Sequence, residues 1–377
     1  MLRYDVIVVG LGAMGSATVC ALASRGHAVL GLDRYSSPHA MGSSHGKTRI
    51  IREAYFEDPL YVPLVQRAYE CWAELERRSG VALFTRTGGL MLGPPSSALV
   101  SGARRSALQH RLPHEILSAD DVQRRFPAFA PGRGMIGVWE PNAGVLQPEL
   151  AISAALGVAT ACGADIHMNE AMQSWRTVAD GVEVTTAMGV YRARRLVLAV
   201  GAWVADALPH LGLPVRVQRN VLYWFAPLHR ADQFTDTHFP IFLCEYAPDR
   251  WWYGFPDSGD GVKVALHLNG EYTHPDALRR DVADGEVAVM RELLARFLPN
   301  ANGALRHATA CMYTNTPDGH FIIDTHPEHA NVIVASPCSG HGFKFASVLG
   351  EVLADLATGR VPAFDLHPFR LSRFGTA

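Results

Sequence analysis

A glycine-rich turn near the start of this 377-residue chain constrains its fold more than any other feature. Residues 10–15 read Gly-Leu-Gly-Ala-Met-Gly, a G-x-G-x-x-G pattern between an apolar strand pattern at residues 4–9 and a helix pattern at residues 13–24. A second strand is expected over residues 28–33. This order predicts a βαβ unit, whose parallel strands lie inside a sheet with both faces covered.

The same turn predicts a dinucleotide-binding site. Its glycines let a pyrophosphate approach the backbone N–H groups at the start of the helix. Asp33, at the end of the second strand, can accept hydrogen bonds from ribose hydroxyls. Residues 34–52 are polar and show no regular third βα unit, which suits an extended cofactor. The residues expected to contact it here are Gly10, Gly12, Ala13, Met14, Gly15, Asp33 and Arg34.

Bulk composition excludes several other classes of protein. The formal net charge is -2, and no concentrated run of Lys and Arg predicts a nucleic-acid surface. The apolar N-terminal segment is too short and too interrupted by glycine for a membrane span, so we expect a cytoplasmic protein. The six cysteines are scattered without a C-x-x-C pair, and neither a disulfide framework nor a metal site is expected.

The rest of the chain predicts an α/β fold with two layers. Helix patterns occupy residues 61–78, 150–163 and 343–356, and strand patterns occupy 182–190, 195–200, 321–324 and 331–335. Residues 215–306 are rich in aromatic residues and suit an antiparallel sheet. We therefore assign residues 1–85, 145–215 and 305–377 to a discontinuous cofactor-binding domain, and residues 86–144 and 216–304 to a substrate domain.

Four further motifs make the sequence familiar. They are residues 43–52 (SSHGKTRIIR), residues 252–256 (WYGFP) with the following Lys263 and His267, residues 310–314 (ACMYT) and residues 339–345 (SGHGFKF). In this order and spacing the chain resembles the monomeric sarcosine oxidase and N-methyltryptophan oxidase family over almost its whole length. The stretch from Ser339 is especially similar to N-methyltryptophan oxidase. The resemblance implies a Rossmann-like FAD-binding domain with an inserted, mostly antiparallel β substrate domain.

The resemblance also implies a covalent cofactor. Family members attach FAD through its 8α-methyl group to the cysteine that corresponds to Cys311, a residue that would otherwise be interpreted as a buried thiol. The helix start near residues 340–343 could stabilise negative charge on the reduced flavin. The further cofactor contacts that the family motifs imply are Ser43, Ser44, Thr48, Gly340, Gly342, Phe343 and Lys344.

The substrate that the family implies is a secondary amine bearing a carboxylate. Arg52 and Lys344 match the family's carboxylate-binding pair, and a planar guanidinium can hold a carboxylate through two hydrogen bonds. Lys344 lies at an expected helix start, where a cation is disfavoured unless an anion is close. Tyr253 and His267 match residues on the substrate side of the pocket.

The catalytic residues that the same resemblance implies are His45, Arg49, Lys263, Tyr253 and His267. His45 and Arg49 match residues packed near the flavin ring, where positive charge favours flavin reduction. Lys263 matches the lysine that activates molecular oxygen, the expected electron acceptor. Because side chains alternate along a strand, Lys263 and His267 can share one face. The expected reaction oxidises an N-methyl amino acid such as sarcosine or N-methyl-L-tryptophan and yields hydrogen peroxide, with the chain acting as a monomer.

Two positions depart from the family pattern. Lys47 replaces an acidic residue that family members commonly carry, and Cys338 stands where an apolar step is expected. Three alternatives stay open: an oxidase of a cyclic or glycated secondary amino acid such as pipecolate or a fructosyl amino acid, a flavin-binding protein without turnover, and a nicotinamide dehydrogenase. The last of these explains the glycine turn but gives no reason for the motifs around Cys311 and Lys344.

Overall fold

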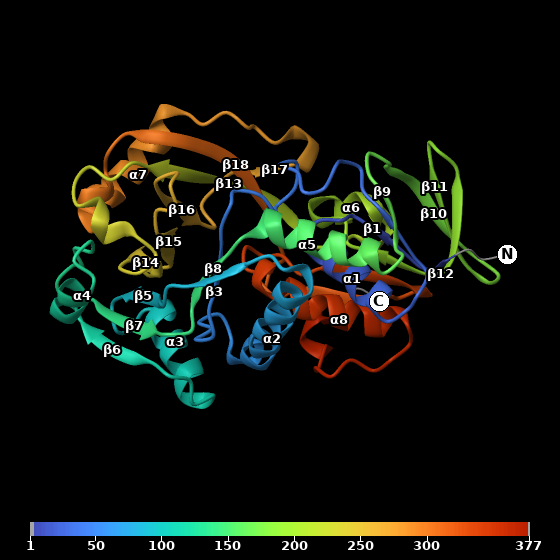
Figure 1. Ribbon diagram of the computed structural model, residues 1–377, viewed down its shortest axis with the longest axis horizontal. Coiled ribbons are helices and arrows are strands. Elements are labelled where there is room, and N and C mark those ends of the chain that lie inside the picture. The colour runs from blue at the N-terminus through green and yellow to red at the C-terminus, as the bar shows by residue number, and fades with distance from the viewer. Residues whose placement is uncertain (1–3, 376–377) are drawn as a thin grey trace.

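The computed structural model describes residues 4–375, which form two large β-sheets and a small sheet between them (Figure 1). In Figure 1 the sheet that contains the glycine turn lies on the right, where both ends of the chain also lie. The second large sheet lies on the left. The expected α/β class is confirmed, with a parallel layer and a mostly antiparallel layer in one chain.

The first sheet has eight strands, and its centre is parallel. β1 pairs with β2 and β12, β2 with β9, and β12 with β20, all in parallel, whereas β10, β11 and β19 add antiparallel edges. Its strands are β1 (Tyr4–Val9), β2 (Val29–Leu32), β9 (Asp165–His167), β10 (Met172–Val178), β11 (Gly181–Thr186), β12 (Val190–Leu198), β19 (Ile322–His326) and β20 (His329–Ser336).

The expected βαβ unit is present, and both faces of its sheet are covered. Val6 and Val8 of β1 belong to the core shared with the helices, whereas Ile7 and Val9 belong to the core on the opposite face. This split follows from the alternation of side chains along a strand. A continuous apolar strand such as residues 6–9 is therefore explained by burial on both sides.

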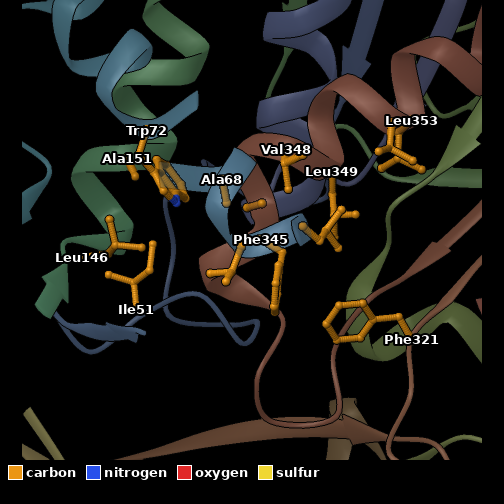
Figure 2. Close-up of a cluster of buried hydrophobic side chains, with 14 of the residues drawn as sticks. Ile51, Ala68, Trp72, Leu146, Ala151, Phe321, Phe345, Val348, Leu349 and Leu353 are labelled. Carbon is orange, nitrogen blue, oxygen red and sulfur yellow. The ribbon is translucent and has the colours of Figure 1, made fainter. Parts of the chain in front are cut away.

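Four helices pack together on one face of this sheet: α1 (Ala13–Ser24), α2 (Val62–Ser79), α5 (Pro148–Ala161) and α8 (Ala346–Ala357). Figure 2 shows their core, in which Val348 and Leu349 of α8 lie beside Phe345 and the α2 residues Ala68 and Trp72. This packing holds α8 beside the helix that follows the glycine turn, because α1 contacts both α5 and α8.

The second sheet has nine strands and is antiparallel except where β5 pairs with β14. The helices on this side of the molecule are α3 (Ala98–Gln109), α4 (Ala119–Arg125) and α7 (Asp284–Phe297). The strands are β5 (Gly89–Gly93), β6 (Glu115–Ser118), β7 (Ile136–Glu140), β13 (Arg216–Phe225), β14 (Ile241–Ala247), β15 (Arg250–Phe255), β16 (Val262–His267), β17 (Tyr272–Thr273) and β18 (Leu305–Asn315). The small third sheet contains β3 (Arg49–Ile51), β4 (Phe84–Arg86) and β8 (Gly144–Leu146).

Alternation along β15 and β16 separates a core face from a site face. Trp252, Val262 and Val264 pack in the core that α7 covers. Tyr253 and Ala265, on the opposite face, pack with Cys311 of β18. The sequence pattern in these strands therefore places the polar and reactive side chains of both strands on one side of the sheet.

Several expected boundaries shift by a few residues. The strand expected at residues 182–190 ends at Thr186, because residues 187–189 form the turn between the antiparallel strands β11 and β12. The helix expected from residue 343 begins as a 3₁₀ turn, η7 (Phe343–Phe345), before α8. The assignment of residues to two domains stays a prediction. Residues 305–315, which it gives to the cofactor-binding domain, form β18 and pair along β13 within the nine-stranded sheet. Within residues 4–375, no helix combines the length and apolar character that a membrane span needs.

Candidate active site

The glycine turn brings backbone into close contact at the end of β1. Gly10 has a φ of +89°, and a Cβ on Gly15 would lie 1.7 Å from the carbonyl oxygen of Gly10. Glycine is therefore required at position 15 for α1 to approach β1 this closely. The N-terminus of α1 opens directly after this turn, so its free N–H groups and the helix dipole favour a bound anion there.

Asp33 lies beside the turn and is 5% exposed. Its Oδ2 accepts a hydrogen bond from the N–H of Leu11 at 2.6 Å, and its Oδ1 accepts one from the N–H of Tyr35 at 2.8 Å. These bonds fix the carboxylate at the end of β2, where it remains part of the cavity lining. A fixed acceptor at this position fits the ribose of a dinucleotide.

One cavity of about 920 Å³ connects the glycine turn with the site face of the second sheet. It brings together most of the residues that the sequence singled out. Those that line it are Gly10, Gly12, Ala13, Met14, Asp33, Arg34, Ser43, Ser44, Thr48, Arg49, Arg52, Tyr253, His267, Cys311, Gly340, Gly342, Phe343 and Lys344. Gly15, His45 and Lys263 are not part of the lining, although each contacts or neighbours a residue that is.

The polar atoms beside this cavity fit an extended polar cofactor. Ser43 Oγ and His45 Nε2 are buried and have no hydrogen-bond partner within the described residues. Burial of an unpaired polar group is costly, so such atoms commonly mark the place of a bound group. Together with the open glycine backbone and the carboxylate of Asp33, these two atoms fit a flavin dinucleotide.

Cys311 lies on β18 at 2% exposure, beside the Arg49 guanidinium, which donates its hydrogen bonds to backbone carbonyl oxygens of residues 43–48. Arg49 Nη2 lies 3.9 Å from Cys311 Sγ and donates hydrogen bonds to the carbonyl oxygens of Ser43 and His45. Desolvation, reinforced by the Arg49 cation, lowers the pKa of His45 to about 4. Arg49 therefore supplies positive charge beside the thiol, whereas His45 is neutral near pH 7.

Lys263 is 2% exposed and lies beneath the segment that carries Arg49. Its Nζ donates hydrogen bonds to Gly46 O at 2.7 Å and to the carbonyl and hydroxyl oxygens of Thr48, each at 2.9 Å. Burial, and next the Arg49 cation, lowers the pKa of this ammonium. Position 46 favours glycine, since its φ is +98° and a Cβ there would lie 2.5 Å from Leu222 Cδ1.

His267, Tyr253 and Tyr313 form a polar cluster above the site face. Tyr313 OH lies 3.5 Å from His267 Nδ1 and 3.3 Å from Tyr253 OH. Burial lowers the pKa of His267 to about 4 and raises the pKa of Tyr253. His267 is therefore neutral near pH 7, and this cluster offers uncharged hydrogen-bonding groups.

Arg52 is 2% exposed and forms an ion pair with Glu57 through two hydrogen bonds, which the sequence analysis did not predict. Its Nη2 donates to Glu57 Oε1 at 2.8 Å and to Oε2 at 2.6 Å. Although burial raises it, Arg52 and the nearby cations lower the pKa of Glu57 to about 2. One nitrogen of the guanidinium therefore already binds both oxygens of a protein carboxylate.

Lys344 is 5% exposed within η7 and lies in the same cavity. Its Nζ donates to the carbonyl oxygen of His341 at 2.8 Å and lies 3.4 Å from Tyr55 OH. Desolvation, followed by repulsion from Arg52, lowers the pKa of Lys344 to about 7. Lys344 is therefore a buried lysine in the cavity lining.

Gly340 and Gly342 explain how this segment reaches the cavity. Gly340 has a φ of +75°, and a Cβ there would lie 2.8 Å from Tyr313 and 3.0 Å from His267. A Cβ on Gly342 would lie 1.6 Å from Pro337 O. Position 340 therefore needs glycine for the loop to pass the polar cluster, and position 342 needs glycine for the loop to fold back on Pro337.

Three other residues from the sequence analysis differ in place: Arg34 is exposed at the cavity, Lys47 lies outside it, and Cys338 lies in its lining. Arg34 lines the cavity but is half-exposed and pairs with Asp276 at 3.1 Å. Lys47 is exposed and pairs with Asp260 at 2.7 Å, so its departure from the family pattern affects a surface loop. Cys338 lines the cavity, and burial raises the pKa of its thiol to about 11.

One group of potential metal ligands occurs in residues 4–375: His210, His326 and Glu328. The Nε2 atoms of the two histidines lie 2.9 Å apart, and His326 Nδ1 accepts the N–H of Glu328 at 3.1 Å. Nδ1 of His326 therefore carries no proton, and the proton on Nε2 is donated to His210. The two histidines therefore already bind each other through a hydrogen bond.

Comparison with known proteins places this geometry in context. The model of a family described as FAD dependent oxidoreductase matches residues 5–356. Monomeric sarcosine oxidase of Streptomyces avermitilis is 44% identical over 99% of this chain and 98% of the relative. N-methyl-L-tryptophan oxidase of Salmonella typhimurium is 40% identical over 99% of this chain and 100% of the relative. The solved structure of NikD, an unusual amino acid oxidase essential for nikkomycin biosynthesis, superposes with a TM-score of 0.85 at 26% identity, covering 98% of both chains.

Proposed function

The chain belongs to the FAD-dependent oxidoreductase family, and we propose that it oxidises the N-methyl group of a secondary amino acid such as sarcosine or N-methyl-L-tryptophan. The overall reaction converts the N-methyl amino acid, O₂ and water into the primary amino acid, formaldehyde and H₂O₂. Two electrons and two protons leave the substrate, O₂ receives them, and water hydrolyses the imine. The relatives whose names state sarcosine or N-methyl-L-tryptophan as substrate cover the whole chain.

The observation that carries the proposal is the pair of buried cations in the cavity that also contains the dinucleotide turn. Arg52 and Lys344 supply the positive charge that a substrate carboxylate needs in a partly dry site. The pairing of Arg52 with Glu57 supports this role, because the guanidinium already donates two hydrogen bonds to a carboxylate. Substrate binding therefore requires Arg52 to share or release Glu57.

The neutral groups near the cations suit the amine end of the substrate. The low pKa of His267 keeps its ring uncharged, so it does not add a third positive charge next to the substrate. Tyr253 and Tyr313 provide hydroxyl groups on the same side. Desolvation and the nearby cations lower the pKa of the substrate ammonium, which favours the free amine that oxidation requires.

The cofactor of the proposal is FAD, joined to Cys311 Sγ through its 8α carbon. When bound, FAD accepts a hydride equivalent from the N-methyl carbon and returns the electrons to O₂. On this chain, the Arg49 guanidinium lies 3.9 Å from Cys311 Sγ, where its positive charge would stabilise negative charge on a bound ring. The unpaired Ser43 Oγ and His45 Nε2 are available to hydrogen-bond the group.

Lys263 is proposed to promote the reaction with oxygen. Its ammonium is buried below the Thr48 segment, and an ammonium held there stabilises the superoxide-like charge that develops as O₂ is reduced. Its three hydrogen bonds to protein oxygens fix its position without a neutralising carboxylate. The protein is proposed to act as a monomer, which the name of the sarcosine oxidase relatives states of those proteins.

A panel of amines with two product assays tests the substrate class. Sarcosine, N-methyl-L-tryptophan, pipecolate and fructosyl glycine are each incubated with the holoenzyme in air, and formaldehyde and H₂O₂ are quantified. We expect equal amounts of both products from an N-methyl amino acid. H₂O₂ without formaldehyde, from pipecolate or fructosyl glycine alone, would replace the proposal by the cyclic or glycated alternative. No product from any of the four would leave a flavin-binding role.

A further inference from the structure

Tyr55 lies between the two cations of the proposed carboxylate site and is fully buried. The guanidinium carbon of Arg52 lies 4.4 Å from the centroid of the Tyr55 ring. Lys344 Nζ lies 5.2 Å from the same centroid and 3.4 Å from the Tyr55 hydroxyl oxygen. A single aromatic side chain therefore contacts both cations, one through its ring face and the other also through its hydroxyl group.

The hydrogen bonds of His341 determine the direction of the Tyr55 hydroxyl group. His341 Nε2 lies 3.0 Å from the carbonyl oxygen of Gly319, which can only accept, so Nε2 carries the ring proton. Burial lowers the pKa of His341 to about 3, and its ring is therefore neutral. Its Nδ1, 2.6 Å from Tyr55 OH, must then accept the hydroxyl proton. A lone pair of the hydroxyl oxygen remains available to Lys344.

His341 and Tyr55 together occupy two directions around the Lys344 ammonium. The carbonyl oxygen of His341 accepts from Nζ at 2.8 Å, and the Tyr55 hydroxyl lies at 3.4 Å. An ammonium has three N–H groups in a fixed tetrahedral arrangement. When two of them are directed at protein oxygens, the direction of the third is determined, and it is free for a ligand in the cavity.

Packing holds the Tyr55 side chain and backbone in place. Tyr61 and Phe345 lie against its ring, with centroid distances of 4.9 Å and 5.4 Å. On the backbone side, Ser106 Oγ of α3 donates to the carbonyl oxygen of Tyr55. The ring therefore has little freedom to follow a ligand, and the cations must adapt to it rather than the reverse.

We propose that Tyr55, oriented by His341, is the positioning residue of the carboxylate site, which fixes both Arg52 and the free N–H of Lys344. This inference rests on the proposed function, since it assumes that Arg52 and Lys344 bind a carboxylate. Tyr55 itself does not react. Removal of its hydroxyl group leaves the ring beside Arg52 but removes one of the two acceptors that orient the Lys344 ammonium. The substitution should therefore weaken the binding of anions and leave the binding of uncharged ligands unchanged.

Calorimetric titration of the holoenzyme with propionate, and with propionamide as the uncharged probe, tests this role. Tyr55→Phe should raise the Kd of propionate by about 10-fold, the cost of one lost hydrogen bond to a charged group. The Kd of propionamide should stay unchanged. Tyr61→Phe is the matched control, because it removes a buried hydroxyl group from the same aromatic cluster, where its partner is His320 at 3.0 Å.

Two substitutions of His341 separate orientation from packing. His341→Asn keeps an acceptor at the Nδ1 position and should bind propionate within about 2-fold of the parent. His341→Gln keeps the donor toward Gly319 but loses that acceptor, so it should weaken propionate binding like Tyr55→Phe. Equal losses in Tyr55→Phe and Tyr61→Phe, or parental affinity in both Tyr55→Phe and His341→Gln, would overturn the positioning role. A parent holoenzyme that does not bind propionate would instead overturn the carboxylate site itself.

Discussion

At the scale of single residues, the site combines reactive groups that burial has altered. Lys263 and Lys344 are both buried cations, yet their surroundings differ. Lys263 has three protein acceptors, whereas Lys344 has two and faces the cavity beside Arg52. The three acceptors of Lys263 hold its charge in one place, which suits oxygen reduction. Lys344 keeps one N–H group for a ligand, which suits carboxylate binding.

The covalent link predicts a simple outcome for Cys311→Ala. Without the sulfur, acid precipitation should release all FAD into the supernatant, whereas the parent protein should retain its yellow colour in the pellet. Cys338→Ala is the matched control, because Cys338 also lines the cavity as a free thiol. FAD that stays with the precipitated Cys311→Ala protein would exclude the proposed linkage.

The pKa of Lys344 predicts how anion binding depends on pH. Its value of about 7 in the free protein means that the ammonium is present below pH 7 and is lost above it. A bound carboxylate stabilises the ammonium and raises this pKa, so propionate affinity should fall by up to about 10-fold per pH unit above pH 7. Calorimetry of the parent and of Lys344→Met checks this; an equally steep fall in Lys344→Met would assign the effect to another group.

Lys263→Met should separate the two halves of the reaction. Loss of a buried charge near the site of O₂ reduction is expected to slow air oxidation of the reduced protein by about 100-fold. Anaerobic reduction by substrate should change far less, and stopped-flow absorbance follows both steps. Lys47→Met, which removes an exposed lysine paired with Asp260, is the control. Equal slowing of both steps would contradict the proposed role.

Residues with local motifs could be predicted from the sequence, whereas residues that act through long-range contacts could not. Arg52 and Lys344 were expected in the site, and both line the cavity. Tyr55, Glu57 and His341 were missed, because the contact between Tyr55 and His341 joins positions 286 residues apart. The one available signal for Glu57 was an acid five residues after Arg52, which is too common a spacing to identify an ion pair.

At the scale of secondary-structure elements, the glycine turn is the most sensitive junction. In Gly15→Ala, a Cβ 1.7 Å from Gly10 O would force α1 away from β1. We expect a loss of roughly 3 kcal/mol or more in the free energy of unfolding, together with reduced FAD content. Gly157→Ala in α5 is the control, since that position is open and alanine should add about 0.5–1 kcal/mol. Denaturant unfolding and flavin absorbance measure both, and an unaltered Gly15→Ala protein would refute the close approach.

Element type was easier to predict than element boundaries. β1, α1 and β2 appear almost as expected, because an apolar run, a glycine turn and a helix of small residues form one local signal. The 3₁₀ turn at Phe343 was not predicted, since tertiary packing of Phe345 and Trp72 sets its geometry. Alternation in β16 allows Lys263 and His267 to share one face of the strand, since side-chain direction in a strand follows from sequence spacing alone.

At the scale of the whole molecule, function depends on two sheets that meet at one cavity. The parallel sheet supplies the glycine turn and Asp33, and the antiparallel sheet supplies Cys311, Lys263 and His267. The two large sheets lie on opposite sides of the molecule (Figure 1), and residues from both line the cavity. The sequence motifs predicted which segments would contribute, whereas the meeting of the two sheets depends on contacts between segments that are distant in the chain.

A visible spectrum of the purified protein, recorded before and after anaerobic addition of sarcosine or N-methyl-L-tryptophan, tests whether the protein oxidises an N-methyl amino acid with a bound flavin. We expect a flavin spectrum that bleaches with one of these substrates and returns when air is admitted. A flavin spectrum that neither substrate bleaches would contradict the proposed oxidation of an N-methyl amino acid, and a colourless protein that takes up no FAD would contradict the cofactor site as well.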